Sequence, residues 1–98
     1  MTITTEKKDA AVTLHIGGRL DTTTAPELEA AVNALPEDVK DLTLDMAEVA
    51  YISSAGLRVL LGAQKKMNKI GSMKLTGVCG TVMDVLEITG FADILTII

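Results

Sequence analysis

Residues 42–71 read LTLDMAEVAYISSAGLRVLLGAQKKMNKIG. In the first five of these residues, apolar side chains alternate with polar ones, which is the period of two typical of a β-strand with one buried face. A connecting stretch, Ala47–Ser53, follows. A helix is then expected from about Ser54 to Ile70, ending at Gly71, because a glycine readily adopts the left-handed conformation that closes many helices. The segment therefore predicts a strand followed by an α-helix.

The residues before this segment predict two strands and another helix. Apolar and polar residues alternate over Asp9–Gly17, and a shorter strand candidate at Thr2–Thr5 precedes them, so we expect an antiparallel pair that turns at Lys7–Ala10. The sequence Thr-Ala-Pro-Glu at residues 24–27 has the spacing of a capping box with proline in the first turn, which predicts a helix start. Pro36 is expected to end this helix.

Further along the chain, a strand is expected around Met73 and Leu75, followed by a helix over Thr81–Thr89 that Gly90 closes. A last short strand is expected at Ile94–Ile98. The resulting order, strand-strand-helix-strand-helix-strand-helix-strand, contains three successive strand-helix-strand units. A mostly parallel sheet with right-handed crossovers is the topology that such units favour.

The composition favours one small folded domain without cofactor chemistry. With 98 residues, 48% of them apolar and 22% charged, the chain is long enough for a single hydrophobic core, and we assign residues 1–98 to one domain. Aromatic residues make up only 2%, so there is no set of rings on which nucleic-acid bases could stack. A formal charge of −4 disfavours binding to a nucleic-acid duplex or to an anionic membrane.

The cellular compartment is expected to be the cytoplasm. A single cysteine, Cys79, cannot form an internal disulfide, which fits a reducing environment. The first ten residues are polar and charged, and no apolar run approaches the roughly 18 residues that span a bilayer. We therefore expect neither secretion nor membrane insertion.

Conventional catalytic signatures are missing from the sequence. Gly17 and Gly18 lack the later glycine of a phosphate-binding loop and do not open a helix directly. One histidine and one cysteine do not make a zinc site of the usual kind. A nucleophilic pair of His15 and Cys79 is an alternative, but His15 lies within an alternating strand pattern, which favours a structural role. No catalytic residue, metal ligand or cofactor is therefore expected, and the protein is not expected to be an enzyme.

Ser54 stands where the strand of the central segment gives way to the helix. As the N-cap, its hydroxyl would accept a hydrogen bond from the backbone N–H of Gly56 or Leu57, which is an ordinary structural role. The alternative is phosphorylation, because the free N–H groups and the positive dipole potential of a helix start accommodate a phosphate.

The helix expected over residues 54–70 has a core face, a basic face and two leucines between them. On a helical wheel the apolar stripe comprises Val59, Leu60, Ala63, Met67 and Ile70. Leu57 and Leu61 stand beside this stripe and near Ser54, so they form either a small, partly exposed patch or part of a wide core face. Arg58 and the lysines opposite are typical of a solvated helix face, with steering of a partner as the alternative.

The stretch YISSAGLRVL at residues 51–60, together with Gly-Arg-Leu-Asp at residues 18–21 and the order of elements, resembles the bacterial anti-sigma-factor antagonists of the STAS domain family. The resemblance extends over essentially the whole chain. It implies an α/β fold, a single small domain with a mostly parallel four- to five-stranded sheet and helices packed mainly on one face. In that family a serine two residues before the helix-opening glycine is phosphorylated by a partner anti-sigma factor that is itself a serine kinase. By position this serine is Ser54.

The resemblance also implies a partner interface around Ser54. Its candidate residues are Asp21, Thr22, Ser53, Gly56, Leu57, Arg58 and Leu61. Relatives typically read Asp-Ser-Ser-Gly, whereas residues 53–56 here read Ser-Ser-Ala-Gly, so Ser53 replaces the aspartate and becomes a second candidate acceptor. Many relatives carry a further helix after the last strand, whereas this sequence stops at Ile98. The cover over one sheet edge is therefore expected to be thinner, or to come from a partner.

Three hypotheses follow. In the first, the unmodified protein, a monomer or weak dimer, binds an anti-sigma serine kinase and so releases a sigma factor, and phosphorylation of Ser54 ends the binding. In the second, the domain is a non-switching scaffold subunit of a transporter or signalling assembly. In the third, it is a small nucleotide-binding or enzymatic domain, for which the sequence contains no phosphate cradle and no catalytic pair.

Overall fold

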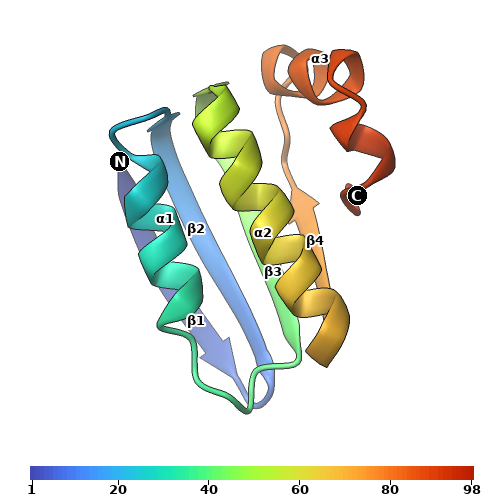
Figure 1. The fold of residues 1–98 in the computed structure, drawn as a ribbon. Coiled ribbons are helices and arrows are strands. Elements are labelled where there is room, and N and C mark those ends of the chain that lie inside the picture. The colour runs from blue at the N-terminus through green and yellow to red at the C-terminus, as the bar shows by residue number, and fades with distance from the viewer.

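The computed structural model describes residues 1–98 and consists of one sheet covered by helices. The elements along the chain are β1 (Thr2–Lys8), β2 (Ala11–Leu20), α1 (Ala25–Asn33), β3 (Asp41–Ile52), α2 (Ser54–Ile70), β4 (Ser72–Thr76), α3 (Gly80–Ile88) and the 3-10 helix η1 (Phe91–Asp93). The four strands lie in the order β1-β2-β3-β4, with β1 antiparallel to β2 and the other pairs parallel. Helices α1 and α2 lie side by side across one face of the sheet, and α3 lies beyond the carboxyl end of β4 (Figure 1). The predicted α/β architecture is confirmed.

The core lies between the sheet and helices α1 and α2. Parallel pairing sets Leu14, Leu44 and Leu75 side by side across three strands, and each is at most 1% exposed. Leu28 of α1 and Leu60 of α2 are completely buried above them. Burial of a leucine side chain contributes about 1.5 to 3 kcal/mol to folding, so an aliphatic core of this kind needs no aromatic residues. The opposite face of the sheet is polar and carries no helix.

Strand β3 is longer than the sequence pattern predicts. The stretch Ala47–Ser53, expected to be a connection, continues the strand as far as Ile52. Irregularities in the pairing with β2, beside Gly17 and Gly18, shift the register, and Gly18 has a φ of 105° that favours glycine. Along this part of β3 the buried side chains are therefore Met46, Val49 and Ile52, three residues apart instead of two. Because this spacing differs from the alternation typical of a strand, the second half of β3 was not predicted.

The chain after α3 forms less sheet than expected. Gly90 adopts the left-handed conformation, with a φ of 81°, in agreement with its predicted role at the end of the helix. The strand predicted at Ile94–Ile98 is absent as a regular element, and a single bridge joins Ile97 to Leu75. Because the residues of η1 turn as a 3-10 helix, the chain reaches the edge of β4 only at its last few residues.

The start of α1 and the end of α2 lie near the predicted positions, but the interactions that form them differ from the predicted ones. Pro26 lies in the first turn of α1 as expected, but the capping box does not form, because the Thr24 hydroxyl donates to the carbonyl of Arg19 and Thr24 makes no side-chain cap. Gly71 follows α2 with an extended φ of 177°, not the predicted left-handed one. Glycine is needed there for close approach, since an added Cβ would lie 1.8 Å from the carbonyl oxygen of Lys40. No helix in the structure combines the length and apolar character needed to cross a membrane.

Candidate functional site

The candidate site lies at the edge of the sheet where parallel strands β2 and β3 both end. In α/β sheets this edge, at the carboxyl ends of the strands, is where functional loops usually gather. The backbone N–H of Ser53 donates a hydrogen bond of 2.9 Å to the carbonyl of Leu20 and so ties the start of α2 to the end of β2. Two loops that are distant in sequence, after β2 and after β3, therefore share one rigid base.

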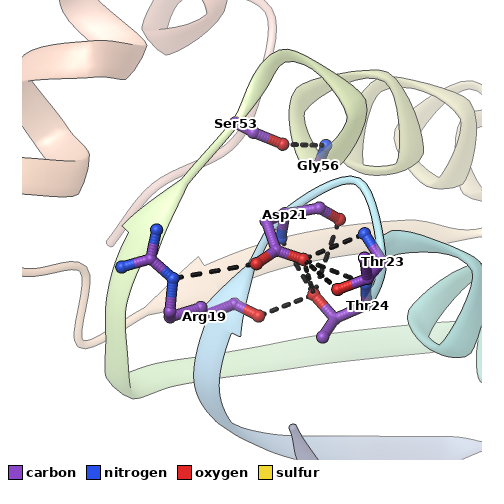
Figure 2. A network of polar contacts seen from close by, with 6 residues as sticks. All are labelled: Arg19, Asp21, Thr23, Thr24, Ser53 and Gly56. Carbon is purple, nitrogen blue, oxygen red and sulfur yellow. Dashed lines mark hydrogen bonds and ion pairs between the residues drawn. The ribbon is translucent and has the colours of Figure 1, made fainter.

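Ser53, and not Ser54, is the N-cap of α2. The Ser53 hydroxyl accepts a hydrogen bond of 3.4 Å from the backbone N–H of Gly56 (Figure 2). The Ser53 carbonyl accepts one of 3.0 Å from the backbone N–H of Leu57. The prediction that Ser54 fills this role is wrong, because Ser54 already lies inside the helix and the capping position therefore falls on Ser53. Ser54 is the first residue within the helix; it is exposed, and its hydroxyl makes no hydrogen bond.

Gly56 and Leu57 lie beneath the surface of the site. Gly56 is buried, and a Cβ there would lie 2.7 Å from a side-chain carbon of Leu20, so only glycine lets α2 start this close to β2. The sequence allows two alternatives for Leu57 and Leu61, a partly exposed patch or a wide core face. Leu57 is only 6% exposed and belongs to the core face, since the first turn of α2 points this side chain into the core. Leu61 is partly exposed, and Arg58 is exposed.

The loop between β2 and α1 is organised by the carboxylate of Asp21. One of its oxygens accepts hydrogen bonds from the Thr23 hydroxyl at 2.7 Å and from the backbone N–H groups of Thr23 and Thr24 at 3.0 and 3.1 Å (Figure 2). These bonds, led by that from the Thr23 side chain, hold the pKa of Asp21 below its usual value. Asp21 therefore acts inside its own loop, whereas Thr22 at the tip is exposed and outside this network.

A contact between Arg19 and Tyr51 extends the site, and neither residue was proposed from the sequence as part of it. The two residues are paired in register on β2 and β3, and the Arg19 guanidinium lies 4.1 Å from the centre of the Tyr51 ring. The same guanidinium lies 3.7 Å from Asp21 (Figure 2). Arg19 and Tyr51 are neighbours only because of the register between β2 and β3. That register depends on two irregularities in the pairing, which the sequence alone does not show.

The start of α2 is electropositive. Its first turn contains no acidic residue, the backbone N–H groups there carry the positive end of the helix dipole, and Arg58 lies four residues after Ser54 on the same side of the helix. The exposed Ser54 hydroxyl thus stands in surroundings that accommodate an added anionic group. The chemistry available at the site is modification of a hydroxyl and docking of a partner.

His15 and Cys79 do not form a nucleophilic pair. Both ring nitrogens of His15 bind carboxylates on the polar face of the sheet, at 2.7 Å from Asp45 and 2.6 Å from Glu6. The Cys79 thiol lies instead near the carbonyl of Val49, 3.5 Å away. The structural role expected for His15 is the one observed.

Comparison with known proteins gives one family. The model of the STAS domain matches residues 2–98. The chain belongs to the STAS domain family. Similar proteins include an anti-sigma-B factor antagonist of Staphylococcus aureus (strain NCTC 8325 / PS 47), 30% identical over 97 residues, an alignment that covers 97% of this chain and 90% of the relative.

Two solved structures extend the comparison for this STAS domain. The crystal structure of an anti-sigma factor antagonist from Mycobacterium paratuberculosis matches with a TM-score of 0.87 and 25% identity, over 98% of this chain and 83% of that one. A sulfate transporter family protein from Wolinella succinogenes matches with a TM-score of 0.78 and 25% identity, over 88% of this chain and 71% of that one. The fold is thus shared by regulators and by a transporter family protein.

Proposed function

We propose that this STAS domain is an anti-sigma-factor antagonist whose partner binding is switched by phosphorylation of Ser54. Unmodified, it binds an anti-sigma factor that is a serine kinase and so releases a sigma factor in the cytoplasm. The observation that carries the proposal is the Ser54 hydroxyl, which is exposed and without a hydrogen bond at the start of α2. The name of the Staphylococcus aureus relative, anti-sigma-B factor antagonist, supports the same role.

Ser54 is the better acceptor of the two adjacent serines. The Ser53 side chain is half-buried and caps α2, so its phosphorylation would remove the cap and require the chain to move. The Ser54 side chain is exposed and leaves both the cap and the hydrogen bond from Ser53 to Leu20 intact. Ser53 takes the capping role in this chain, which leaves the Ser54 hydroxyl for the switch.

Phosphorylation is expected to change the surface and leave the fold intact. A phosphate adds about −1.5 to −2 charges at pH 7 and three acceptor oxygens. The start of α2 tolerates this charge, because Arg58 and the N-terminal end of the helix dipole are positive and no acidic residue lies in the first turn. Phosphorylation is instead expected to weaken partner binding, because acidic or apolar groups of the partner would meet the new charge and bulk.

The docking surface proposed around Ser54 comprises exposed and partly exposed side chains. Thr22 lies at the tip of the β2 to α1 loop, and Arg58 and Leu61 follow Ser54 along α2. Asp21, Ser53, Gly56 and Leu57 are proposed to support this surface from below by fixing its backbone. The chain itself supplies a hydroxyl acceptor and a surface, so catalysis of the phosphoryl transfer is assigned to the partner.

Phosphorylation by the serine-kinase anti-sigma factor of the same organism tests the proposal directly. The purified protein is incubated with that kinase and ATP, and the peptide containing residues 53 and 54 is analysed by tandem mass spectrometry. We expect one phosphate, on Ser54, and none in the Ser54→Ala variant, with Ser53→Ala retaining modification. An unmodified peptide in the unsubstituted protein would sink the switch, and phosphate on Ser53 alone would refute the assignment.

A non-switching scaffold role is the second candidate, and the structural match to a sulfate transporter family protein favours it. In this role the same surface is permanently covered by a larger assembly. Co-purification with such an assembly that is insensitive to Ser54→Asp would support the scaffold over the switch.

A further inference from the structure

The seam between α1 and α2 carries a row of hollows, here called the seam groove, that starts beside the Ser54 end of α2. Three hollows of about 230, 60 and 450 Å³ follow one another along this seam. Glu29 and Val59 line both the first and the second, and Asn33 and Lys66 line both the second and the third. The groove therefore runs along nearly the whole of α2. At a rise of 1.5 Å per residue, the span from Ala55 to Ile70 is about 22 Å.

Gly62 lies at the middle of this groove and has no intramolecular reason to be glycine. It is exposed within a helix, where glycine costs about 0.5 to 1 kcal/mol relative to alanine. A Cβ added at Gly62 would meet nothing within 4 Å, whereas one added at Gly56 would meet Leu20 at 2.7 Å. A flat position of this kind allows a second backbone to approach the helix closely. The occupant is thus better matched by a polypeptide segment than by a small molecule.

The charged residues on the α1 and α2 sides of the groove indicate which kind of polypeptide segment it fits. The α1 side presents Glu29 and, in the segment after α1, Glu37, whereas the α2 side presents Arg58 and Lys66, and all four residues are exposed. The Lys66 amine also donates a hydrogen bond of 3.4 Å across the seam to the carbonyl of Val32. Between them, Val59 and Ala63 contribute apolar surface. An amphipathic helix fits this arrangement if its apolar side faces the seam and its acidic side chains face α2.

We propose that the seam groove receives a helical, acidic-flanked segment of the same partner that docks at Ser54. This inference rests on the proposed function, and it extends the contact from the start of α2 past Gly62 to Lys66. The first hollow connects the two regions, because it is lined by Thr22 and Arg58 as well as by groove residues. The groove then supplies affinity that does not depend on the modification, while Ser54 supplies the switch.

The test measures two quantities, affinity and thermal stability, on the full chain. Binding to the purified serine-kinase anti-sigma factor is titrated by calorimetry without ATP, so that no phosphate is transferred, for Gly62→Ala, Gly62→Gln, Lys66→Gln and the matched control Lys65→Gln. Lys65 is exposed on α2 and lines none of the hollows. The melting temperature of each variant shows whether a loss of affinity arises from unfolding.

We expect Gly62→Gln to melt no lower than the unsubstituted protein and to bind at least about 10-fold more weakly, since a long side chain then fills the groove. Lys66→Gln is expected to weaken binding more than Lys65→Gln. If Gly62→Gln and Lys66→Gln both bind with unchanged affinity, the proposal that a partner segment occupies the groove is overturned. If Ser54→Asp abolishes binding while these two variants bind normally, only the groove proposal is rejected and the proposed function stands. If the unsubstituted protein does not bind the kinase, both the groove proposal and the proposed function are rejected.

Discussion

The backbone N–H of Ser53 donates a hydrogen bond of 2.9 Å to the carbonyl of Leu20, and this single bond sets the candidate phosphoacceptor beside the loop that follows β2. The bond holds Ser53 in the extended conformation of an N-cap, with ψ at 176°, so that the next residue begins the helix with its side chain exposed. Capping and acceptor roles are therefore divided between two adjacent serines.

This division predicts different stability effects at the two positions. Ser53→Ala removes the cap and should lower the free energy of unfolding by about 0.5 to 1 kcal/mol, whereas Ser54→Ala should leave it nearly unchanged. Ser53→Asp should retain the cap, because a carboxylate accepts the same hydrogen bond and interacts favourably with the helix dipole. Urea denaturation of the three variants measures the differences. A larger loss for Ser54→Ala than for Ser53→Ala would contradict the assignment of the cap.

Two glycines of α2 are predicted to respond in opposite directions to the same substitution. Gly56→Ala places a methyl group against Leu20 and Ile52 and should destabilise the fold by about 1 to 3 kcal/mol. Gly62→Ala places it in open space and should stabilise the helix by about 0.5 to 1 kcal/mol. Thermal melts of the pair provide the comparison, and a loss of stability for Gly62→Ala would show that this position is restrained from within the molecule.

The polar face of the sheet is predicted to make stability depend on pH. Hydrogen bonds to Asp45 first, and then to Glu6, raise the pKa of His15 above its usual value of 6.5. Because the raised pKa belongs to the folded state, the stabilisation is fully present below about pH 6.5 and is lost as the pH rises through the folded pKa of His15. Melting temperatures between pH 5.5 and 9 should therefore fall more for the unsubstituted protein than for His15→Gln. Parallel curves for the two proteins would exclude this coupling.

Asp21 is predicted to order the loop without contributing to the core. In Asp21→Ala the amides of Thr23 and Thr24 lose their acceptor, so their hydrogen exchange should accelerate while that of the core strands stays the same. Thr22→Ala is the matched control, because Thr22 is exposed and its side chain makes no hydrogen bond. Amide exchange followed by NMR spectroscopy distinguishes the two; equal exchange in both variants would argue against the ordering role.

Much of the fold follows from periodicity, because the buried strands and α2 are regular. The bounds Ser54–Ile70 agree with the expected helix, and Leu14 and Leu44 lie on the predicted face. The second half of β3 was missed because the shift in register changes the spacing of buried residues, and register depends on a partner strand.

The candidate site was predicted less completely, for a related reason. Resemblance to the family indicates Ser54 as the candidate acceptor. Local sequence does not distinguish which of the two serines caps the helix, since the hydrogen bond from Ser53 to Leu20 joins residues 33 positions apart. The contact of Arg19 with Tyr51 and the burial of Leu57 likewise arise from tertiary packing.

The central claim is that a negative charge at Ser54 ends partner binding while the fold remains. The most direct measurement is the affinity of the serine-kinase anti-sigma factor for the unsubstituted protein, Ser54→Ala and Ser54→Asp, with amide spectra recorded to verify the fold of each. We predict that Ser54→Ala binds as tightly as the unsubstituted protein and that Ser54→Asp binds at least about 10-fold more weakly, because its charge opposes docking. Equal affinities for all three folded proteins would contradict the account.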